Sequence, residues 1–395
     1  MITENNNQQL KTRMSGIYIH IPFCKQACHY CDFHFSTNLK KKQEMVFAII
    51  KEIALRKDAF KNEIVETIYF GGGTPSILSN SDLKLVIDSV YQNYNVVHNP
   101  EITVEANPDD VTEERILGLK QIGVNRLSIG IQSFFEEDLL LMNRAHNAKE
   151  AEKCLQIATK HFDNISLDLI YGIPGSTNEK WKQNIEKALS YNIPHISSYA
   201  LTVEPKTALQ KFIQKGIINP PDDAVAEAQF HILIAALEEK GFVHYELSNF
   251  GKPNYFSKNN SAYWLGKKYI GIGPSAHSYD GKNRSWNISN NTLYIQSIQK
   301  NQLPMETELL TLKDRYNEYV MTGLRTIWGV SLERIEKEFG KTYLNYLKEQ
   351  SKRHLADGLL EIVSQNNDEN VLKSTAKGKF LADGIASDLF LLNLE

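Results

Sequence analysis

Three of the four cysteines lie within eight residues, in the run Cys24-Lys-Gln-Ala-Cys28-His-Tyr-Cys31. Three thiolates on one tight loop can bind three corners of an iron–sulfur cube, and because such cubes usually have four cysteine ligands, the fourth iron stays open. An open iron can chelate the amino and carboxylate groups of a small molecule. The alternative is a structural zinc ion completed by His29 or His34, but zinc sites usually combine two ligand pairs and the sequence offers no second pair. We therefore predict that Cys24, Cys28 and Cys31 hold a [4Fe-4S] cluster.

Four polar residues, Glu105, Gln132, Arg144 and Asp168, lie at or shortly after the ends of successive predicted strands. In parallel α/β barrels, ligands bind at the carboxyl ends of the strands, where such side chains converge. Each residue alone could equally cap a helix or bond to loop backbone. Four of them at corresponding places favour one shared pocket.

A run of three glycines, Gly71 to Gly73, ends the second predicted strand and is followed by Thr74. Glycine has no Cβ, so the backbone can approach a ligand closely and donate N–H groups to it. A triple glycine alone is more often a simple turn. Its place beside the predicted pocket makes it a candidate binding element.

The N-terminal part of the sequence alternates short β-rich runs with amphipathic helical stretches. Strict alternation implies βαβ units and a parallel sheet, wound by right-handed crossovers into either an open sheet or a barrel. The predicted strands are 16–21, 67–70, 102–105, 126–131, 165–171 and 195–201. The predicted helices between them are 42–57, 81–92, 112–121, 149–161 and 178–190.

The pattern changes after Thr202, with a helix predicted over 223–240 and a strand over 243–247. From Thr311 the sequence is mainly helical. Helices followed by a small hairpin indicate a winged-helix-like module, and its mixed acidic and basic residues favour a structural cap over a DNA-binding function. The predicted elements of this part are helices 313–325, 332–338 and 343–357, strands 360–364 and 371–374, and a last helix 377–391. The predicted organisation is a disordered tail 1–15, a parallel α/β domain 16–240, a connecting segment 241–305 and a helical domain 306–395.

The bulk composition argues against several classes of function. A formal net charge of -3 gives no whole-chain field that would attract nucleic acid or anionic lipid. The first 13 residues lack the apolar core of a secretory signal, and the best apolar run, 230–237, is far too short to span a bilayer. Clustered cysteines favour metal binding in a reducing compartment over a disulfide scaffold. We expect a cytoplasmic protein with no transmembrane segment and no nucleic-acid partner.

From residue 16 to about 201, these motifs resemble those of the radical S-adenosylmethionine (SAM) superfamily. The resemblance implies a partial parallel (β/α)6 TIM-like barrel, in which an electron from the cluster breaks the C–S bond of SAM and releases a 5′-deoxyadenosyl radical. Glu105 and Asp168 would bind the amino or ribose groups of SAM, and Arg144 its carboxylate. The full set of cofactor-binding residues that the resemblance implies is Tyr18, Gly72, Gly73, Thr74, Glu105, Gln132, Arg144 and Asp168.

The chain is more specifically similar to the coproporphyrinogen III oxidase-like branch of that superfamily. Its last segment resembles the C-terminal HemN-type domain of this branch, so the similarity extends over nearly the whole chain. The segments that carry the resemblance are Tyr18-Ile-His-Ile-Pro-Phe-Cys24, the glycine run with Thr74-Pro-Ser76, Glu105-Ala-Asn-Pro108, Arg126-Leu-Ser-Ile-Gly-Ile-Gln132, Arg144-Ala-His146, Asp168-Leu-Ile-Tyr-Gly-Ile-Pro-Gly175 and Gly271-Ile-Gly-Pro-Ser-Ala-His277.

Two functions compete within this branch. Oxygen-independent coproporphyrinogen III oxidases decarboxylate two propionates of a porphyrinogen, whereas HemW-type proteins are heme chaperones that pass heme to an acceptor protein. The oxidases carry a further cysteine two residues after the third, where this sequence has Phe33, and a long N-terminal extension, where only 23 residues precede Cys24. Segments 197–205 and 260–264 resemble the HemW-type versions. The resemblance thus favours a heme chaperone that binds a cluster, SAM and heme. It implies that SAM is cleaved and that coproporphyrinogen is not oxidised. It identifies neither the heme acceptor nor the electron donor.

One position departs from the HemW-type pattern. These proteins usually show His-Asn-x-x-Tyr-Trp, and here Asn259 replaces the histidine. Imidazole is the ordinary axial ligand of heme iron and an amide is not. The sequence offers His20, His146, His195 and His277 instead, but we expect each of them to be structural or to lie close to SAM. It therefore does not identify a heme ligand.

Overall fold

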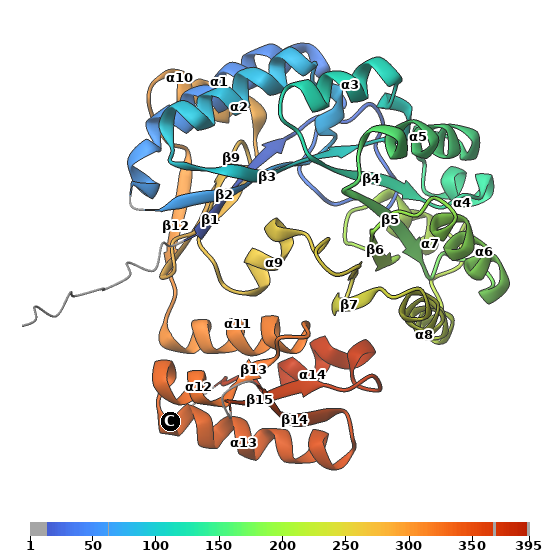
Figure 1. The fold of residues 1–395 in the computed structure, drawn as a ribbon, viewed down its shortest axis with the longest axis vertical. Helices are drawn as coiled ribbons and strands as arrows, with labels where there is room; N and C mark the ends of the chain where they lie inside the picture. Colours follow the sequence, from blue (N-terminus) through green and yellow to red (C-terminus); the bar gives the residue numbers. More distant parts are fainter. Residues whose placement is uncertain (1–13, 62, 366–368, 393–395) are drawn as a thin grey trace, which may run out of the picture.

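A partial barrel of parallel strands forms the N-terminal part of the computed structural model, which describes residues 14–61, 63–365 and 369–392. Each strand from β1 to β6 pairs in parallel with the next, and helices cover the outer face of the sheet (Figure 1). The strands are β1 Met14–Ile21, β2 Ile64–Gly72, β3 Val96–Ala106, β4 Arg126–Gln132, β5 Ile165–Tyr171 and β6 His195–Ala200. The helices between them are α1 Lys42–Leu55, α2 Asn80–Asn93, α3 Glu113–Gln121, α4 Glu136–Leu141, α5 Ala148–His161 and α6 Asn178–Leu189.

This arrangement confirms the predicted α/β fold and the alternation of strands and helices. Most of the predicted tail, residues 1–13, lies outside the described residues, whereas its last two residues, Met14 and Ser15, already belong to β1. β4 is buried along its whole length, as expected of a central parallel strand. Several helices begin where short polar side chains cap them: Ser79 with Asp82 caps α2, and Asn147 with Glu150 caps α5.

The sheet continues at both edges with strands that come mainly from 241–305. The strand order is β12-β11-β10-β9-β1-β2-β3-β4-β5-β6-β8-β7, so β12 and β7 form the two edges and the barrel is open. The segment expected to be a connection therefore completes the sheet. The added strands are β7 Val243–Glu246, β8 Asn249–Gly251, β9 Tyr269–Ile272, β10 His277–Tyr279, β11 Asn283–Asn287 and β12 Met305–Leu309. The remaining helices of this part are α7 Ala208–Gln214, α8 Asp223–Glu239, α9 Lys258–Trp264 and α10 Asn291–Gln299.

Helix α9 packs under the amino ends of the strands, on the inner side of the arc (Figure 1). The buried Asn259 accepts a hydrogen bond from the Thr67 hydroxyl at 3.2 Å, and its own N–H donates to the Glu101 carboxylate. Asn259 thus closes the end of the barrel opposite the cysteine loop, since Thr67 lies early in β2 and the loop follows the end of β1.

The C-terminal domain has its own core beneath the barrel (Figure 1). Its sheet has the order β13-β15-β14. Its elements are α11 Leu312–Leu324, β13 Val330–Ser331, α12 Leu332–Phe339, α13 Lys341–Ala356, β14 Leu360–Gln365, β15 Glu369–Ser374 and α14 Ala382–Asp388. The prediction of one helix over 377–391 is wrong: a 3₁₀ turn precedes α14, which ends at Asp388. Beyond it, the Leu389 carbonyl accepts a hydrogen bond from the Tyr316 hydroxyl instead of a bond within the helix.

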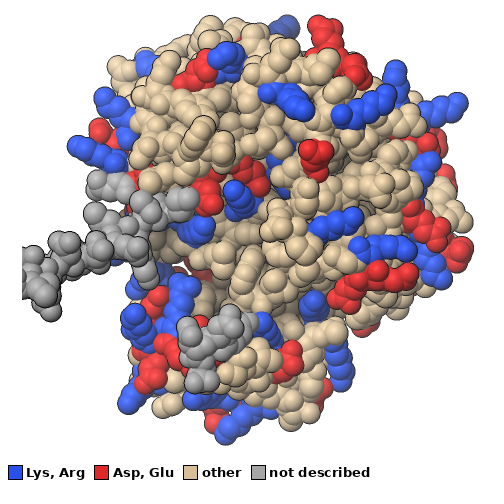
Figure 2. Space-filling view, in the orientation of Figure 1, with Lys and Arg blue, Asp and Glu red and all other residues tan. Residues whose placement is uncertain are grey.

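Charged residues of both signs are interspersed over the face shown in Figure 2. This mixture agrees with the small net charge of -3. Among the described residues, every helix is too short or too polar to cross a bilayer.

Candidate metal centre and cofactor pocket

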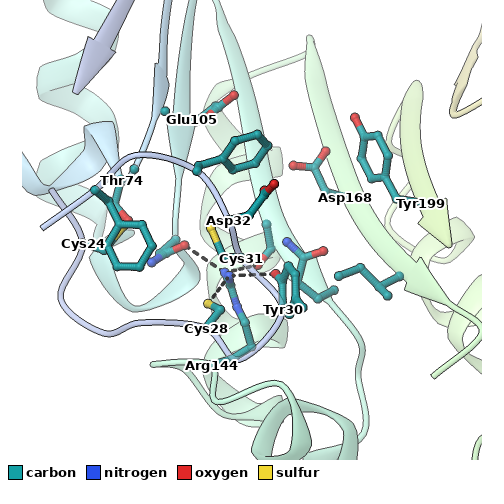
Figure 3. Close-up of a pocket in the computed structure, with 18 of the residues that line it drawn as sticks. Cys24, Cys28, Tyr30, Cys31, Asp32, Thr74, Glu105, Arg144, Asp168 and Tyr199 are labelled. Carbon is teal, nitrogen blue, oxygen red and sulfur yellow. Dashed lines mark hydrogen bonds between the residues drawn. The ribbon is translucent and has the colours of Figure 1, made fainter. Parts of the chain in front are cut away.

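A cavity of about 470 Å³ lies at the carboxyl ends of the parallel strands. The three clustered cysteines reach it from the loop after β1, and Asp168 and Tyr199 line the opposite side in Figure 3. The structure thus brings together the cysteines and seven of the eight residues expected to bind the cofactor. Those seven are Gly72, Gly73, Thr74, Glu105, Gln132, Arg144 and Asp168.

The cysteine loop is anchored to the barrel by its backbone. The Cys24 N–H donates to the Ser36 carbonyl at 3.1 Å, and the His29 N–H donates to the Met142 carbonyl at 3.0 Å. Beside Met142, the His29 ring donates from Nδ1 to the Leu141 carbonyl at 2.8 Å. These bonds fix where the loop lies relative to the barrel.

Arg144 ties the loop to two strand ends through its guanidinium (Figure 3). One nitrogen lies 3.3 Å from the Cys28 sulfur and 3.4 Å from the Tyr30 hydroxyl. The other donates to the Asn107 side chain at 2.9 Å and to the Gly130 carbonyl at 3.0 Å. Its Nε is buried with no hydrogen-bond partner within the described part of the chain. Arg144 can therefore hold the loop and still donate one further hydrogen bond.

Two half-buried carboxyl groups face the cavity from β3 and β5, the strands on either side of β4. Glu105 accepts a hydrogen bond from the Tyr69 hydroxyl at 2.7 Å, and Asp168 accepts one from Ser128 at 3.3 Å. Burial raises the pKa of each carboxyl to about 7, because water no longer solvates the charge. The two negative charges also disfavour each other, which adds to the rise in the Glu105 pKa. A cationic ligand would favour the ionised form of both groups.

At the end of the glycine run, backbone N–H groups donate hydrogen bonds to the end of β1 and to the start of the cysteine loop, not into the cavity. The Gly73 N–H donates to a carbonyl at the end of β1 at 2.9 Å, and the Thr74 N–H donates to the Phe23 carbonyl at 2.7 Å. A Cβ at Gly73 would lie 2.6 Å from that same carbonyl oxygen, so only glycine fits there. The N–H donation to a ligand that was predicted for the glycine run is therefore wrong for Gly73, because its N–H bonds to the end of β1. The Thr74 N–H holds the cysteine loop.

Tyr18 does not line the cavity. Its ring stacks on Tyr69 with centroids 6.0 Å apart, and Tyr69 in turn bonds to Glu105, so Tyr18 supports the wall from behind. Sequence reasoning missed several residues that do line the cavity. They are Tyr30, Asn107, Ser128 and Tyr199. Asn107 could have been found, because it directly follows β3.

The site fits an iron–sulfur cube better than a zinc ion. No group of three or more His, Cys, Asp or Glu side chains in the described ranges is arranged to hold one metal ion, whereas a cube binds each thiolate through a different iron. The two histidines that could complete a zinc site are engaged elsewhere: His29 with Leu141, and His34 with Asn291 at 2.8 Å. Burial raises the pKa of Cys31 to about 12, so metal binding, which needs thiolates, would release protons.

Known proteins match the chain along nearly its whole length. Residues 18–203 match the radical SAM superfamily, and residues 310–381 match the HemN C-terminal domain. The chain is 35% identical to heme chaperone HemW of Bacillus subtilis over 381 residues, covering 94% of this chain and 98% of the relative. The chain belongs to the HemW family of radical SAM proteins. The HemW of Mycobacterium tuberculosis is 31% identical, with 95% of this chain and 94% of the relative covered.

The fold of this HemW-family chain is also that of a solved relative. The structure of coproporphyrinogen III oxidase (HemN) from Escherichia coli superposes with a TM-score of 0.82 at 23% identity, covering 96% of this chain and 90% of that one. At that identity the likeness shows the fold alone. The predicted family and fold class are therefore confirmed.

Proposed function

We propose that this chain is a cytoplasmic heme chaperone that binds heme, carries a [4Fe-4S] cluster with SAM and passes the heme to an acceptor protein. The observation that carries the proposal is the 35% identity over 381 residues to a protein named heme chaperone HemW. The arrangement of the three cysteines around one cavity supports the cluster.

In this proposal, Cys24, Cys28 and Cys31 hold three irons, and SAM occupies the rest of the cavity. Bound and reduced, the cluster supplies an electron to SAM. Glu105 and Asp168 would face the cationic groups of SAM. A positive charge nearby would lower the pKa of both carboxyl groups and so favour their ionised forms. The free Nε of Arg144 is available to a carboxylate.

A porphyrinogen oxidase is the second candidate, favoured by the shared fold with HemN. The presence of phenylalanine at position 33 argues against oxidase activity. This ring is 67% exposed at the cavity, and it brings no nucleophilic, acidic or ligating group to the position where the oxidases carry a cysteine.

One sample can test both functions. The chain is reconstituted anaerobically with iron and sulfide, titrated with heme, and assayed for coproporphyrinogen decarboxylation and for heme transfer to an apo-hemoprotein. We expect about one heme per chain, transfer to the acceptor and no decarboxylation. A sample that binds no heme would refute the chaperone.

A further inference from the structure

A second cavity, of about 450 Å³, lies between the barrel and the C-terminal domain. Its barrel side comes from α9, β9, β10 and β11, and its other side from α11 and α12. It lies at the amino end of the strands, because Tyr269 in its wall pairs with Gly16 at the start of β1. The cysteine loop follows the other end of β1, roughly 17 Å away at the usual rise per residue of a strand.

Aromatic rings line both walls of this interdomain cavity. On the barrel side, Tyr263 and Tyr269 meet edge to face with centroids 4.5 Å apart, and Tyr279 lies beside Tyr269. On the other side, Tyr319 and Phe339 stack at 6.3 Å. Rings on two facing walls suit a flat, largely apolar ligand.

The charge of the lining favours an anionic ligand. Three arginines line the cavity, from β11, α11 and α12, against only two glutamates, Glu318 and Glu338. Arg284 pairs with Glu318, and Arg334 pairs with Glu338. Arg315 is half-buried, and within the described ranges its side chain has neither an ion pair nor a hydrogen bond. A guanidinium without a partner at a cavity wall is available to a carboxylate.

We propose that this interdomain cavity is the heme site, with the macrocycle between the two aromatic walls and a propionate on Arg315. The inference rests on the proposed function and adds the place where heme binds. Heme has two apolar faces and two carboxylates, which match the rings and the arginines. Of the donor types that ligate heme iron, the lining offers the Met321 thioether and tyrosine hydroxyls. The segment 260–264, which resembles the HemW-type version, reaches this cavity through Tyr263.

The test compares heme with its propionate diester in titrations of the full chain. Arg315→Gln should weaken heme binding about tenfold, the scale for one charge-assisted bond, and should leave the affinity for the diester unchanged within about twofold. Met321→Trp fills the cavity without changing charge and should weaken both ligands. Arg353→Gln is the matched control, because this arginine is 87% exposed on α13, and it should change neither.

The possible outcomes distinguish a wrong heme site from a wrong proposed function. If Arg315→Gln and Met321→Trp both bind heme normally while Phe33→Ala weakens it, heme lies at the cysteine cavity and this inference is wrong, whereas the chaperone stands. If the unaltered chain binds no heme, the proposed function itself fails. Circular dichroism of each variant shows that a loss of binding is not a loss of fold.

Discussion

The Arg144 guanidinium lies 3.3 Å from the Cys28 sulfur, although 116 positions separate the two residues in the sequence. The same side chain bonds to Tyr30 in the loop and to Asn107 and Gly130 at strand ends. A cation is therefore fixed beside a cysteine that we expect to bind iron. Hydrogen bonds to cluster sulfurs and the net charge nearby both set the potential of iron–sulfur clusters.

Arg144→Gln should make the reduction potential of the reconstituted cluster more negative. Removing a positive charge disfavours the reduced, more negative cluster, so we expect a shift of roughly 50–100 mV, equivalent to about 1–2 kcal/mol for one electron. A redox titration followed by electron paramagnetic resonance measures it. Arg353→Gln should leave the potential unchanged, and an unchanged potential in Arg144→Gln would mean that the guanidinium does not act on the cluster.

Cys28→Ser should lose most of the bound iron. Anaerobically purified protein should be brown and contain about four irons and four sulfides per chain, because three thiolates hold the cube. Cys154→Ser is the matched control, since this thiol is buried in α5 away from the cavity lining, and it should keep the full content. Iron and zinc analysis measures both, and stoichiometric zinc in a colourless sample would contradict the cluster.

Asp168→Asn should stabilise the metal-free protein above about pH 7. The pKa of this carboxyl is about 7 in the folded protein, against an ordinary value of 3.8. Between these two pH values the carboxyl is protonated in the native state and ionised in the unfolded state. Stability therefore falls as pH rises through that window, by at most about 4 kcal/mol. Denaturant unfolding at pH 5 and pH 8 should show a smaller fall for Asp168→Asn. An equal fall in both proteins would show that Asp168 does not titrate there.

The same ionisation should make SAM binding stronger as pH rises from 6 to 8. The carboxylates at Glu105 and Asp168 attract the cationic groups of SAM only after they lose their protons. The expected pH dependence is weaker in Asp168→Asn, and calorimetry of the reconstituted protein at several pH values measures it.

Asn259→Ala should lower stability without altering heme binding. Its side chain accepts a bond from the buried Thr67 hydroxyl beneath the strands, and a lost bond of this kind costs about 1–3 kcal/mol. Thermal unfolding measures the first effect and the heme absorption band the second. Asn260→Ala, at a neighbouring side chain with no hydrogen bond in the described ranges, should change neither.

The sequence predicted the parallel strands and their helices because both patterns are local. It also predicted ten of the 26 residues that line the cavity, since residues at the ends of parallel strands must meet. The two edges of the sheet could not be predicted, because strands as short as Asn249–Gly251 pair with segments far away in the chain. The hydrogen bonds that Gly73 and Thr74 donate to Ile21 and Phe23 could not be predicted for the same reason, because they join segments that lie far apart in the sequence.

Coproporphyrinogen decarboxylation should stay at background, and Phe33→Cys should not restore it. The Phe33 ring has no donor atom that could ligate the cluster, and at 67% exposure it does not enclose a substrate. A radical formed beside an unoriented substrate is quenched before it abstracts the propionate hydrogen, because rate enhancement depends on a closed site and a near-attack geometry. A cysteine alone would add a thiol without that enclosure. Release of 5′-deoxyadenosine in the same sample serves as the control that the cluster is active. Protoporphyrinogen formed over many turnovers by the unaltered chain would overturn the chaperone assignment and establish the oxidase.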